Sequence, residues 1–258
     1  MKTKRLKLLT IGSNGGFGKY ISKELNTYMF TRKTKLSQLK KEYDVVIHCA
    51  NNPSISINYE NVYDFFYDNF LLTTNLLKLK FKHFIFISSV GIYPSSSKGK
   101  IDENLNFLIK NRSYYEFLKV ISEQHIRKNT KKFSILRTGG LLNSSSRENS
   151  IQKIIKNKNI KLNLSGDSTF NYILYDDLLS FIKIIIEKKK YGIFNVSASK
   201  NIKLSKLKKK LNSNNIKFGD YKYITPKIDN SKARKEYLKL KFTTEKNIDR
   251  YLRIQKNK

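Results

Sequence analysis

The chain has 258 residues, enough for one large α/β domain or for a large domain with a small appendage. No segment approaches the roughly 20 consecutive apolar residues of a membrane helix, and we expect no signal peptide at the N-terminus. The single cysteine, Cys49, excludes an intramolecular disulfide and fits a reducing cytoplasm. The net charge of +32 comes mainly from lysines spread along the whole chain, which argues against nucleic-acid binding as the main function.

Glycines cluster directly after the first expected strand, Arg5–Ile11. Four of the eleven glycines lie between positions 12 and 18, and a helix is expected over Gly15–Leu25. In this loop Gly12 would allow the tight turn, Gly15 the approach of the backbone to phosphates, and Gly18 the close packing of the helix. The helix N-terminus would bind the anion through its free N–H groups. A plain strand–helix turn is the alternative that the loop alone leaves open.

The next strand, Thr27–Thr31, is followed by basic residues. Enzymes that prefer NAD place Asp or Glu at the end of this strand, where the carboxylate binds the ribose hydroxyls. No acidic residue lies between Glu24 and Glu42 in this chain, and Arg32 stands where it could contact a 2′-phosphate. This pattern favours NADP as the cofactor, although the general richness in lysine leaves NAD as an alternative.

Strands and helices alternate up to about residue 140. Further strands are expected at 43–50, 84–88 and 133–137, and helices at 36–41, 59–80 and 113–128. This alternation predicts an α/β fold with a Rossmann-type doubly wound parallel sheet. We expect residues 1–140 to form an NAD(P)-binding domain and residues 141–258 a smaller substrate-binding lobe, from which segments near 172–197 return to the main domain. The lobe is expected to contain helices at 151–156, 176–188 and 204–211, strands at 160–164, 192–196 and 222–225, and a partly helical tail.

Three side chains form a candidate catalytic set: Ser89, Tyr115 and Lys119. Tyr115 and Lys119 are four residues apart in a predicted helix and therefore share a face. A phenol has a pKa of ~10, and an ammonium ~4 Å away is worth ~4 kcal/mol at a dielectric near 20, or about three pKa units. Tyr115 could then act as a general acid or base, with Ser89 orienting the substrate oxygen and hydride moving to or from a nicotinamide.

With these motifs the chain resembles the NAD-dependent epimerase/dehydratase family of the extended short-chain dehydrogenase/reductase superfamily. Gly12 to Gly18 resembles the cofactor loop of that family. The other matching segments are His48 to Asn51, Asp68 to Thr73, Ser88 to Tyr93, Ser113 to Lys119 followed by Glu123, Leu136 to Gly140, Tyr172 to Asp177, Gly192 to Val196 and Asp229 to Ala233.

The resemblance implies a role for each residue at a matching position. Tyr115 would be the acid/base, Lys119 its electrostatic partner and a ribose ligand, and Ser89 the hydroxyl positioner, with Asn69 completing a tetrad. No metal site is implied. The implied cofactor contacts are Gly12, Asn14, Gly15, Gly16, Phe17, Gly18, Arg32, Cys49, Ala50, Asn51, Ser88, Tyr115, Lys119, Thr138 and Gly139.

Departures from the family pattern narrow the expected reaction. Val90 and Gly91 occupy the places of the Asp-Glu pair of sugar 4,6-dehydratases, and Gly91 also replaces the cysteine of fucose-synthase-like enzymes. Phe170 stands where an arginine often binds the nucleotide diphosphate. The expected function is therefore 4-keto reduction or 4-epimerisation of a nucleotide-linked sugar, in surface-polysaccharide synthesis. The alternatives are a reductase of a non-nucleotide carbonyl and a catalytically silent regulatory or RNA-binding protein.

The family also implies a homodimer built from the two long helices, 59–80 and 114–128. Apolar side chains on these helices could form the interface. The candidates are Phe65, Phe66, Phe70, Phe117 and Val120, and the alternative is that these side chains pack on the sheet.

Overall fold

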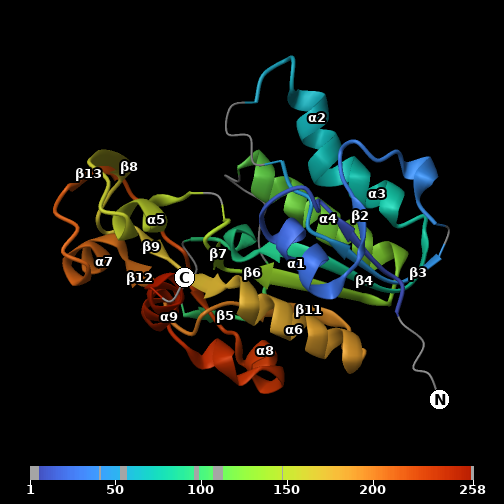
Figure 1. Cartoon of the computed structure of the whole chain (residues 1–258). Helices are drawn as coiled ribbons and strands as arrows, with labels where there is room; N and C mark the ends of the chain where they lie inside the picture. Colours follow the sequence, from blue (N-terminus) through green and yellow to red (C-terminus); the bar gives the residue numbers. More distant parts are fainter. Residues whose placement is uncertain are drawn as a thin grey trace. The chain divides into compact units, whose positions relative to one another are not determined.

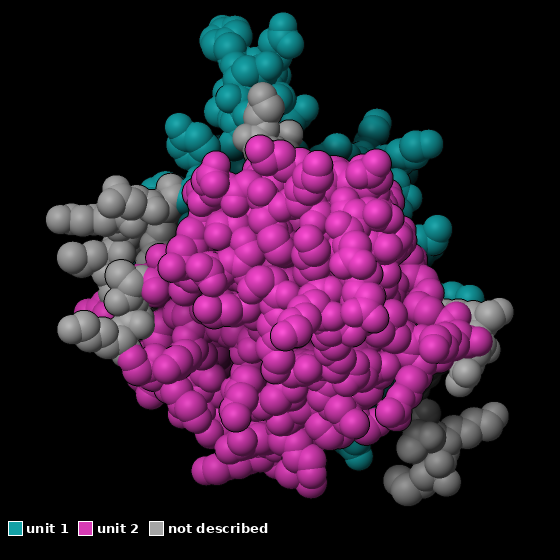
Figure 2. Space-filling view, turned by 90° about the vertical axis from the view of Figure 1, so that its left-hand side faces the viewer, with its two compact units in different colours: residues 1–92, 108–137, 179–194 teal, residues 93–107, 138–178, 195–258 magenta. Residues whose placement is uncertain are grey.

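The computed structural model describes residues 6–40, 42–52, 57–95, 99–106, 113–146 and 148–256. The chain forms two compact units: residues 1–92, 108–137 and 179–194 make up the first, and residues 93–107, 138–178 and 195–258 the second. Figure 2 colours the first unit teal and the second magenta. The expected division into an NAD(P)-binding domain, residues 1–140, and a substrate-binding lobe, residues 141–258, stays a prediction. Arg5 and Lys41, at the ends of two predicted elements, lie outside the described residues.

A six-stranded parallel sheet is centred on the first unit, with the order β2-β1-β3-β4-β6-β11. Its strands are β1 (Leu8–Ile11), β2 (Tyr28–Phe30), β3 (Glu42–His48), β4 (Lys80–Ser89), β6 (Phe133–Thr138) and β11 (Gly192–Val196). The order reverses between β1 and β3, and open α/β sheets bind ligands at the carboxyl ends of strands at such a point. The predicted Rossmann-type α/β fold is confirmed.

The strands are strongly apolar because helices cover both faces of the sheet. The core of the first unit includes Leu9, Ile11, Val46, Phe84 and Ile135, each almost fully buried. In Figure 1, α3 (Leu72–Leu76) and α4 (Tyr114–Asn129) lie above the strands and α6 (Tyr175–Glu187) lies below them.

Two helices of the first unit have clear start signals. Helix α1 (Gly16–Leu25) follows the glycine loop and buries Phe17 and Ile21. Helix α4 begins with a capping box, in which the Ser113 hydroxyl accepts from the Glu116 backbone N–H and the Glu116 carboxylate accepts from the Ser113 N–H. This cap starts the helix one residue before Tyr115.

The predicted long helix 59–80 is shorter and interrupted. It consists of α2 (Val62–Phe66), a π-helical turn η2 (Tyr67–Leu71) and α3, and β4 already begins at Lys80. The π turn contains Asn69, whose side-chain amide donates to the Phe65 carbonyl at 3.0 Å. Wide turns of this kind often occur at functional sites.

The second unit contains short paired strands and helices. The described strand pairs are β7 (Gly140–Leu142) with β10 (Tyr172–Leu174), β9 (Thr169–Phe170) with β12 (Ile202–Lys203), β8 (Ile160–Leu164) with β13 (Ile216–Tyr221), and β5 (Lys100–Ile101) with β14 (Lys227–Ile228). The helices are α5 (Ser150–Ile155), α7 (Leu204–Lys210), α8 (Ser231–Glu236) and α9 (Thr244–Lys256). Residues Leu142, Ile154, Leu174, Leu207 and Ile248 form part of one apolar core.

The predicted strand at 222–225 is wrong. The strands lie on either side of it, in β13 and β14, and Ile224 makes only an isolated bridge to Thr169. Gly219 and Asp220 lower the strand propensity of the segment that does form β13, so the sequence pattern concealed it. Among the described residues, no helix combines the length and the apolar character needed to cross a bilayer.

A buried ion pair joins β6 to α4 in the first unit. Arg137 donates to Glu123 with a shortest N–O distance of 2.7 Å, and the side chains of these two residues are 6% and 3% exposed. The Ser88 hydroxyl donates to the same carboxylate at 2.5 Å. One buried carboxylate therefore holds together β4, β6 and α4.

We predict that Glu123→Ala lowers the free energy of unfolding by about 3–5 kcal/mol, because it leaves the Arg137 guanidinium buried without a counter-ion. Lys203→Ala is the matched control, since it breaks an ion pair with Asp167 whose side chains are both 58% exposed. The control should change stability by at most about 0.5 kcal/mol. Urea unfolding measures both changes, and equal losses in the two variants would contradict the prediction.

Candidate cofactor-binding and catalytic site

The glycine loop after β1 is tightly packed. Gly12 has φ +80°, and a Cβ there would lie 2.6 Å from the Ala50 Cα. A Cβ on Gly18 would lie 2.1 Å from the Gly12 carbonyl oxygen, so α1 can approach the loop only because this residue is glycine. The Gly12 N–H donates to the Phe30 carbonyl at 3.1 Å. The loop is thereby fixed between the end of β2 and the segment after β3.

The outer part of the loop is open. A Cβ on Gly15 would meet no described atom within 4 Å, and Asn14, Gly15 and Gly16 are exposed. The N-terminus of α1 has no side-chain cap and no acidic residue in its first turn. Phe17 is buried and anchors the helix. Exposed N–H groups at an uncapped helix start fit a pyrophosphate, so these residues are compatible with a dinucleotide cofactor.

The segment after β3 lies beside this loop. The Cys49 N–H donates to the Ile11 carbonyl at 2.9 Å, which continues the sheet towards the glycine loop. Burial raises the pKa of the Cys49 thiol to about 12, so the thiol stays neutral at physiological pH. Ala50 contacts Gly12, and Asn51 is exposed at the carboxyl edge of the sheet.

Asn69, in the π turn, holds Asn52, which continues the segment after β3. Its side-chain oxygen accepts from the Asn52 N–H at 3.1 Å, and its amide nitrogen donates to the Asn52 carbonyl at 3.2 Å. The Ser122 hydroxyl of α4 donates to the Asn69 backbone oxygen at 3.0 Å. Asn69 is 4% exposed, so it links α4 to the segment after β3 from below the surface.

Two residues of the predicted catalytic set, Tyr115 and Lys119, lie on α4, and Lys119 contacts the carboxyl-terminal part of β4, where Ser89 is the last residue. Lys119 Nζ lies 5.7 Å from the centroid of the Tyr115 ring and donates to the Ile87 carbonyl at 3.0 Å. Ser89 is the last residue of β4, and its hydroxyl accepts from the Gly91 N–H at 3.0 Å. Tyr115 and Lys119 do share one face of α4.

Burial tunes the charge of Lys119. Lys119 is 4% exposed, and burial lowers the pKa of its ammonium to about 8, against an opposing influence of the Glu123 carboxylate. At neutral pH it is still mostly protonated, so a poorly solvated positive charge lies 5.7 Å from the Tyr115 ring centroid and 4.5 Å from that of Phe86. His48 is also buried, and burial together with Lys119 lowers its pKa to about 3, which keeps the imidazole neutral.

Two predicted cofactor contacts have partners within the first unit. The Ser88 hydroxyl points to Glu123, as described above, and Ser88 is 2% exposed. Arg32 forms an ion pair with Asp68 of the π turn. Sequence reasoning missed Asp68 as a site residue because 36 positions separate it from Arg32 and no spacing rule connects them.

The other predicted residues, Thr138 and Gly139, belong to the second unit. Thr138 ends β6 and is buried, and the Gly139 N–H donates to the Val196 carbonyl at 3.2 Å. In the same unit Phe170 stacks on Tyr223, with ring centroids 5.1 Å apart. Phe170, which the sequence comparison with the family singled out, is therefore part of an aromatic pair.

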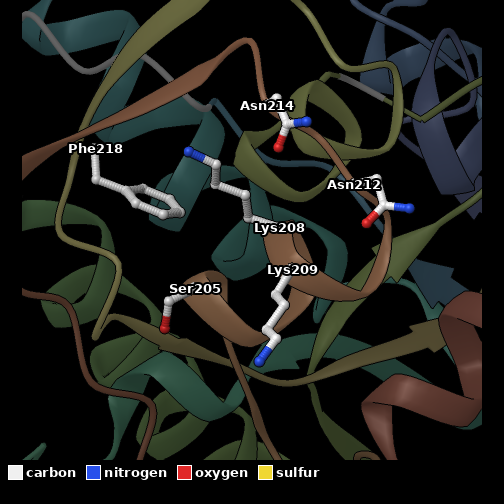
Figure 3. Close-up of a pocket in the computed structure, with 6 residues that line it drawn as sticks. All are labelled: Ser205, Lys208, Lys209, Asn212, Asn214 and Phe218. Carbon is white, nitrogen blue, oxygen red and sulfur yellow. The ribbon is translucent and has the colours of Figure 1, made fainter.

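An open pocket of about 310 Å³ lies on α7 and β13 of the second unit. Figure 3 shows the residues that line it: Ser205, Lys208, Lys209, Asn212, Asn214 and Phe218. Lys208 Nζ donates to the Ile216 carbonyl at 2.6 Å, so this ammonium already has a protein partner. None of the residues predicted from sequence lines this pocket.

The chain is similar in sequence to a curated protein. The chain is 25% identical over 220 residues to a dTDP-D-glucose 4,6-dehydratase of Dictyostelium discoideum, covering 74% of this chain and 51% of that protein. The chain thus spans about half the length of the curated relative it matches.

Two solved structures illustrate the likeness of fold. A dTDP-4-dehydrorhamnose reductase from Clostridium acetobutylicum has a TM-score of 0.77 at 18% identity, covering 97% of this chain and 100% of that one. A UDP-glucuronic acid 4-epimerase from Bacillus cereus, in complex with UDP-glucuronic acid and NAD, has a TM-score of 0.75 at 20% identity, covering 97% and 100%.

A sequence model of the NAD dependent epimerase/dehydratase family matches residues 7–197. This range includes the glycine loop, Ser89, Tyr115 and Lys119. The family expected from the motifs is confirmed, and this chain belongs to the NAD dependent epimerase/dehydratase family.

Proposed function

We propose that this chain is an NAD(P)-dependent enzyme that reduces a 4-keto group, or inverts a 4-hydroxyl group, on a nucleotide-linked sugar. The observation that carries the proposal is the buried Lys119 ammonium 5.7 Å from the Tyr115 ring, at the strand end next to Ser89. A protein that only binds a dinucleotide has no need for a buried cation beside a phenol. The similar structures, a sugar-nucleotide reductase and a 4-epimerase, support the substrate class.

Dehydration is the least favoured of the family's reactions for this chain. A 4,6-dehydratase needs an acid and a base for the two carbons that lose water, and Val90 and Gly91 stand where that carboxylate pair would be. Neither residue can transfer a proton through its side chain.

The chain's own residues account for binding and proton transfer. The Gly12–Gly18 loop and the first N–H groups of α1 would hold the pyrophosphate, with Ala50 and Asn51 lining the cofactor. When bound, the nicotinamide accepts or supplies a hydride. Tyr115 Oη would move the proton of the sugar 4-oxygen, Lys119 would stabilise the phenolate, and Ser89 would orient that oxygen.

We further propose NADP as the preferred cofactor, because Arg32 follows β2 where a 2′-phosphate would lie. The similar structures include one with NADP bound and others with NAD, so both cofactors belong in the test. We place the enzyme in the cytoplasm, where Cys49 would stay a thiol, and its product in surface-polysaccharide synthesis, as the resemblance implies.

The proposal is tested by incubating the protein with a dTDP-linked 4-keto sugar and NADPH or NADH, and separately with UDP-glucuronic acid and either oxidised cofactor. Net loss of absorbance of the reduced nicotinamide identifies a reductase. Isomerisation of the sugar without net redox change identifies a 4-epimerase. Binding of the cofactors without conversion of any sugar would favour a non-nucleotide substrate or a silent binding protein.

We predict that Tyr115→Phe lowers turnover by about 100-fold or more, the usual contribution of a positioned general acid or base. The cofactor dissociation constant should change little, because the phenyl ring remains. The matched control is Tyr114→Phe, since Tyr114 is 71% exposed on the neighbouring position of α4. Full activity of Tyr115→Phe would refute the proposed role.

A second prediction concerns the buried charge of Lys119. The folded state releases this proton at a pKa of about 8 and the unfolded state at about 10.5, so the unfolded state binds more protons between these values. Stability should therefore rise with pH across this window. Relative to Lys119→Met, the wild type should gain about 2 kcal/mol of unfolding free energy between pH 7 and pH 9.5.

Urea unfolding at the two pH values measures this gain. The Ile87 carbonyl loses its partner in Lys119→Met, but that cost is the same at both pH values and cancels in the comparison. The control Lys131→Met removes an exposed lysine and should reproduce the pH dependence of the wild type. Parallel stability profiles for wild type and Lys119→Met would rule out the shifted pKa.

We also propose a homodimer through α2 and α4. Tyr63, Phe66 and Phe117 are 65%, 37% and 41% exposed on these helices, and exposed aromatic side chains are enriched at protein interfaces. Phe65 and Val120, two of the candidates from sequence, are buried within the chain and are not available for an interface.

We predict that Phe66→Glu combined with Phe117→Glu yields a monomer, because two charges would be buried at the interface. Light scattering coupled to gel filtration should give a mass near twice 30.3 kDa for the wild type and near 30.3 kDa for the variant. Leu238→Glu, at a residue 69% exposed in the second unit, is the control and should leave the dimer intact. A monomeric wild type would refute the dimer.

A further inference from the structure

The ion pair between Arg32 and Asp68 connects two distant parts of the first unit. Arg32 follows β2, and Asp68 lies in the π turn η2. The Asp68 carboxylate also accepts from the Asn52 side-chain amide at 3.0 Å, and Asn52 follows β3. One carboxylate thus receives hydrogen bonds from the segments that follow β2 and β3.

These two segments flank the glycine loop. In the sheet β1 lies between β2 and β3, and the loop follows β1 directly. The Gly12 and Ser13 N–H groups donate to the Phe30 carbonyl at the end of β2, and Gly12 packs against Ala50 after β3. The Arg32–Asp68 pair therefore lies at the carboxyl edge, on the side of the loop where a dinucleotide places its adenosine ribose.

The two partners differ in how firmly they are held. The Asp68 side chain is 15% exposed and is fixed by Asn52. The Arg32 side chain is 73% exposed. An ion pair with one well-solvated partner contributes little to stability and opens readily. Arg32 is the partner that can move, whereas Asp68 keeps its place.

We propose that Asp68 limits how strongly the chain prefers NADP over NAD. It supplies the carboxylate that is absent from the end of β2, and it can accept hydrogen bonds from the ribose hydroxyls of NAD. A 2′-phosphate must instead draw Arg32 away from Asp68, and its negative charge is then repelled by the carboxylate that stays behind. Asp68 thus opposes the preference for NADP that Arg32 alone would give. This inference rests on the proposed function, since it requires a dinucleotide in the glycine loop.

The test is a fluorescence titration of NADPH and NADH at fixed ionic strength against wild type, Asp68→Asn, Arg32→Ala and the double variant. Asp68→Asn should shift the ratio of the two dissociation constants towards NADPH by about tenfold or more, the size expected for one charge-assisted interaction. In the Arg32→Ala background the same substitution should improve NADPH binding far less, because the released guanidinium is missing.

The matched control is Asp64→Asn, which removes the same charge from an exposed residue one helical turn earlier. Thermal melting checks that each variant is folded. An unchanged ratio in Asp68→Asn, or an equal shift in Asp64→Asn, overturns the inference while the proposed function stands. If the wild type binds neither cofactor, both are overturned.

Discussion

The site depends on one buried carboxylate. Glu123 accepts from Ser88 at the end of β4 and from Arg137 at the end of β6, and it lies one helical turn beyond Lys119 on α4. Burying two cations in one region is costly unless an anion and hydrogen bonds compensate them. Glu123 compensates Arg137 directly and favours the charged form of Lys119. The position of α4 on the sheet, and with it the position of Tyr115, follows from this arrangement.

The glycine loop depends on close steric packing instead. Gly12 and Gly18 leave room for α1 to approach β1, so the start of the helix points its N–H groups to the carboxyl edge of the sheet. Asn69 holds Asn52 through its side chain and receives Ser122 of α4 through its backbone oxygen. A hydrogen-bonded helix turn thereby couples the segment after β3 to α4.

Local patterns were sufficient to predict most of the first unit. Apolar strands, the glycine spacing and the four-residue separation of Tyr115 and Lys119 each act over a few residues, and the structure contains all of them. Sequence patterns failed where contacts between residues far apart in the chain determine the structure. The partnership of Arg32 with Asp68 arises only when the chain folds back, and β13 forms because Leu162 and Ile160 of β8 pair with it despite Gly219. Which aromatic residues face solvent also depends on the packing of α2, and Phe65, for which the sequence left both an interface and a packed position open, is buried.

The neutral state of Cys49 has a practical consequence. Burial raises the pKa of this thiol to about 12, so thiolate is scarce at pH 7, and only the thiolate reacts with alkylating reagents. Because this is the single cysteine of the sequence, the wild type offers an almost unreactive background for site-directed labels. One cysteine could be introduced into each compact unit, for example at Lys131 and at Leu238. These two cysteines could carry a dye pair while Cys49 is left in place. The distance between the dyes would then measure the separation of the two units in solution.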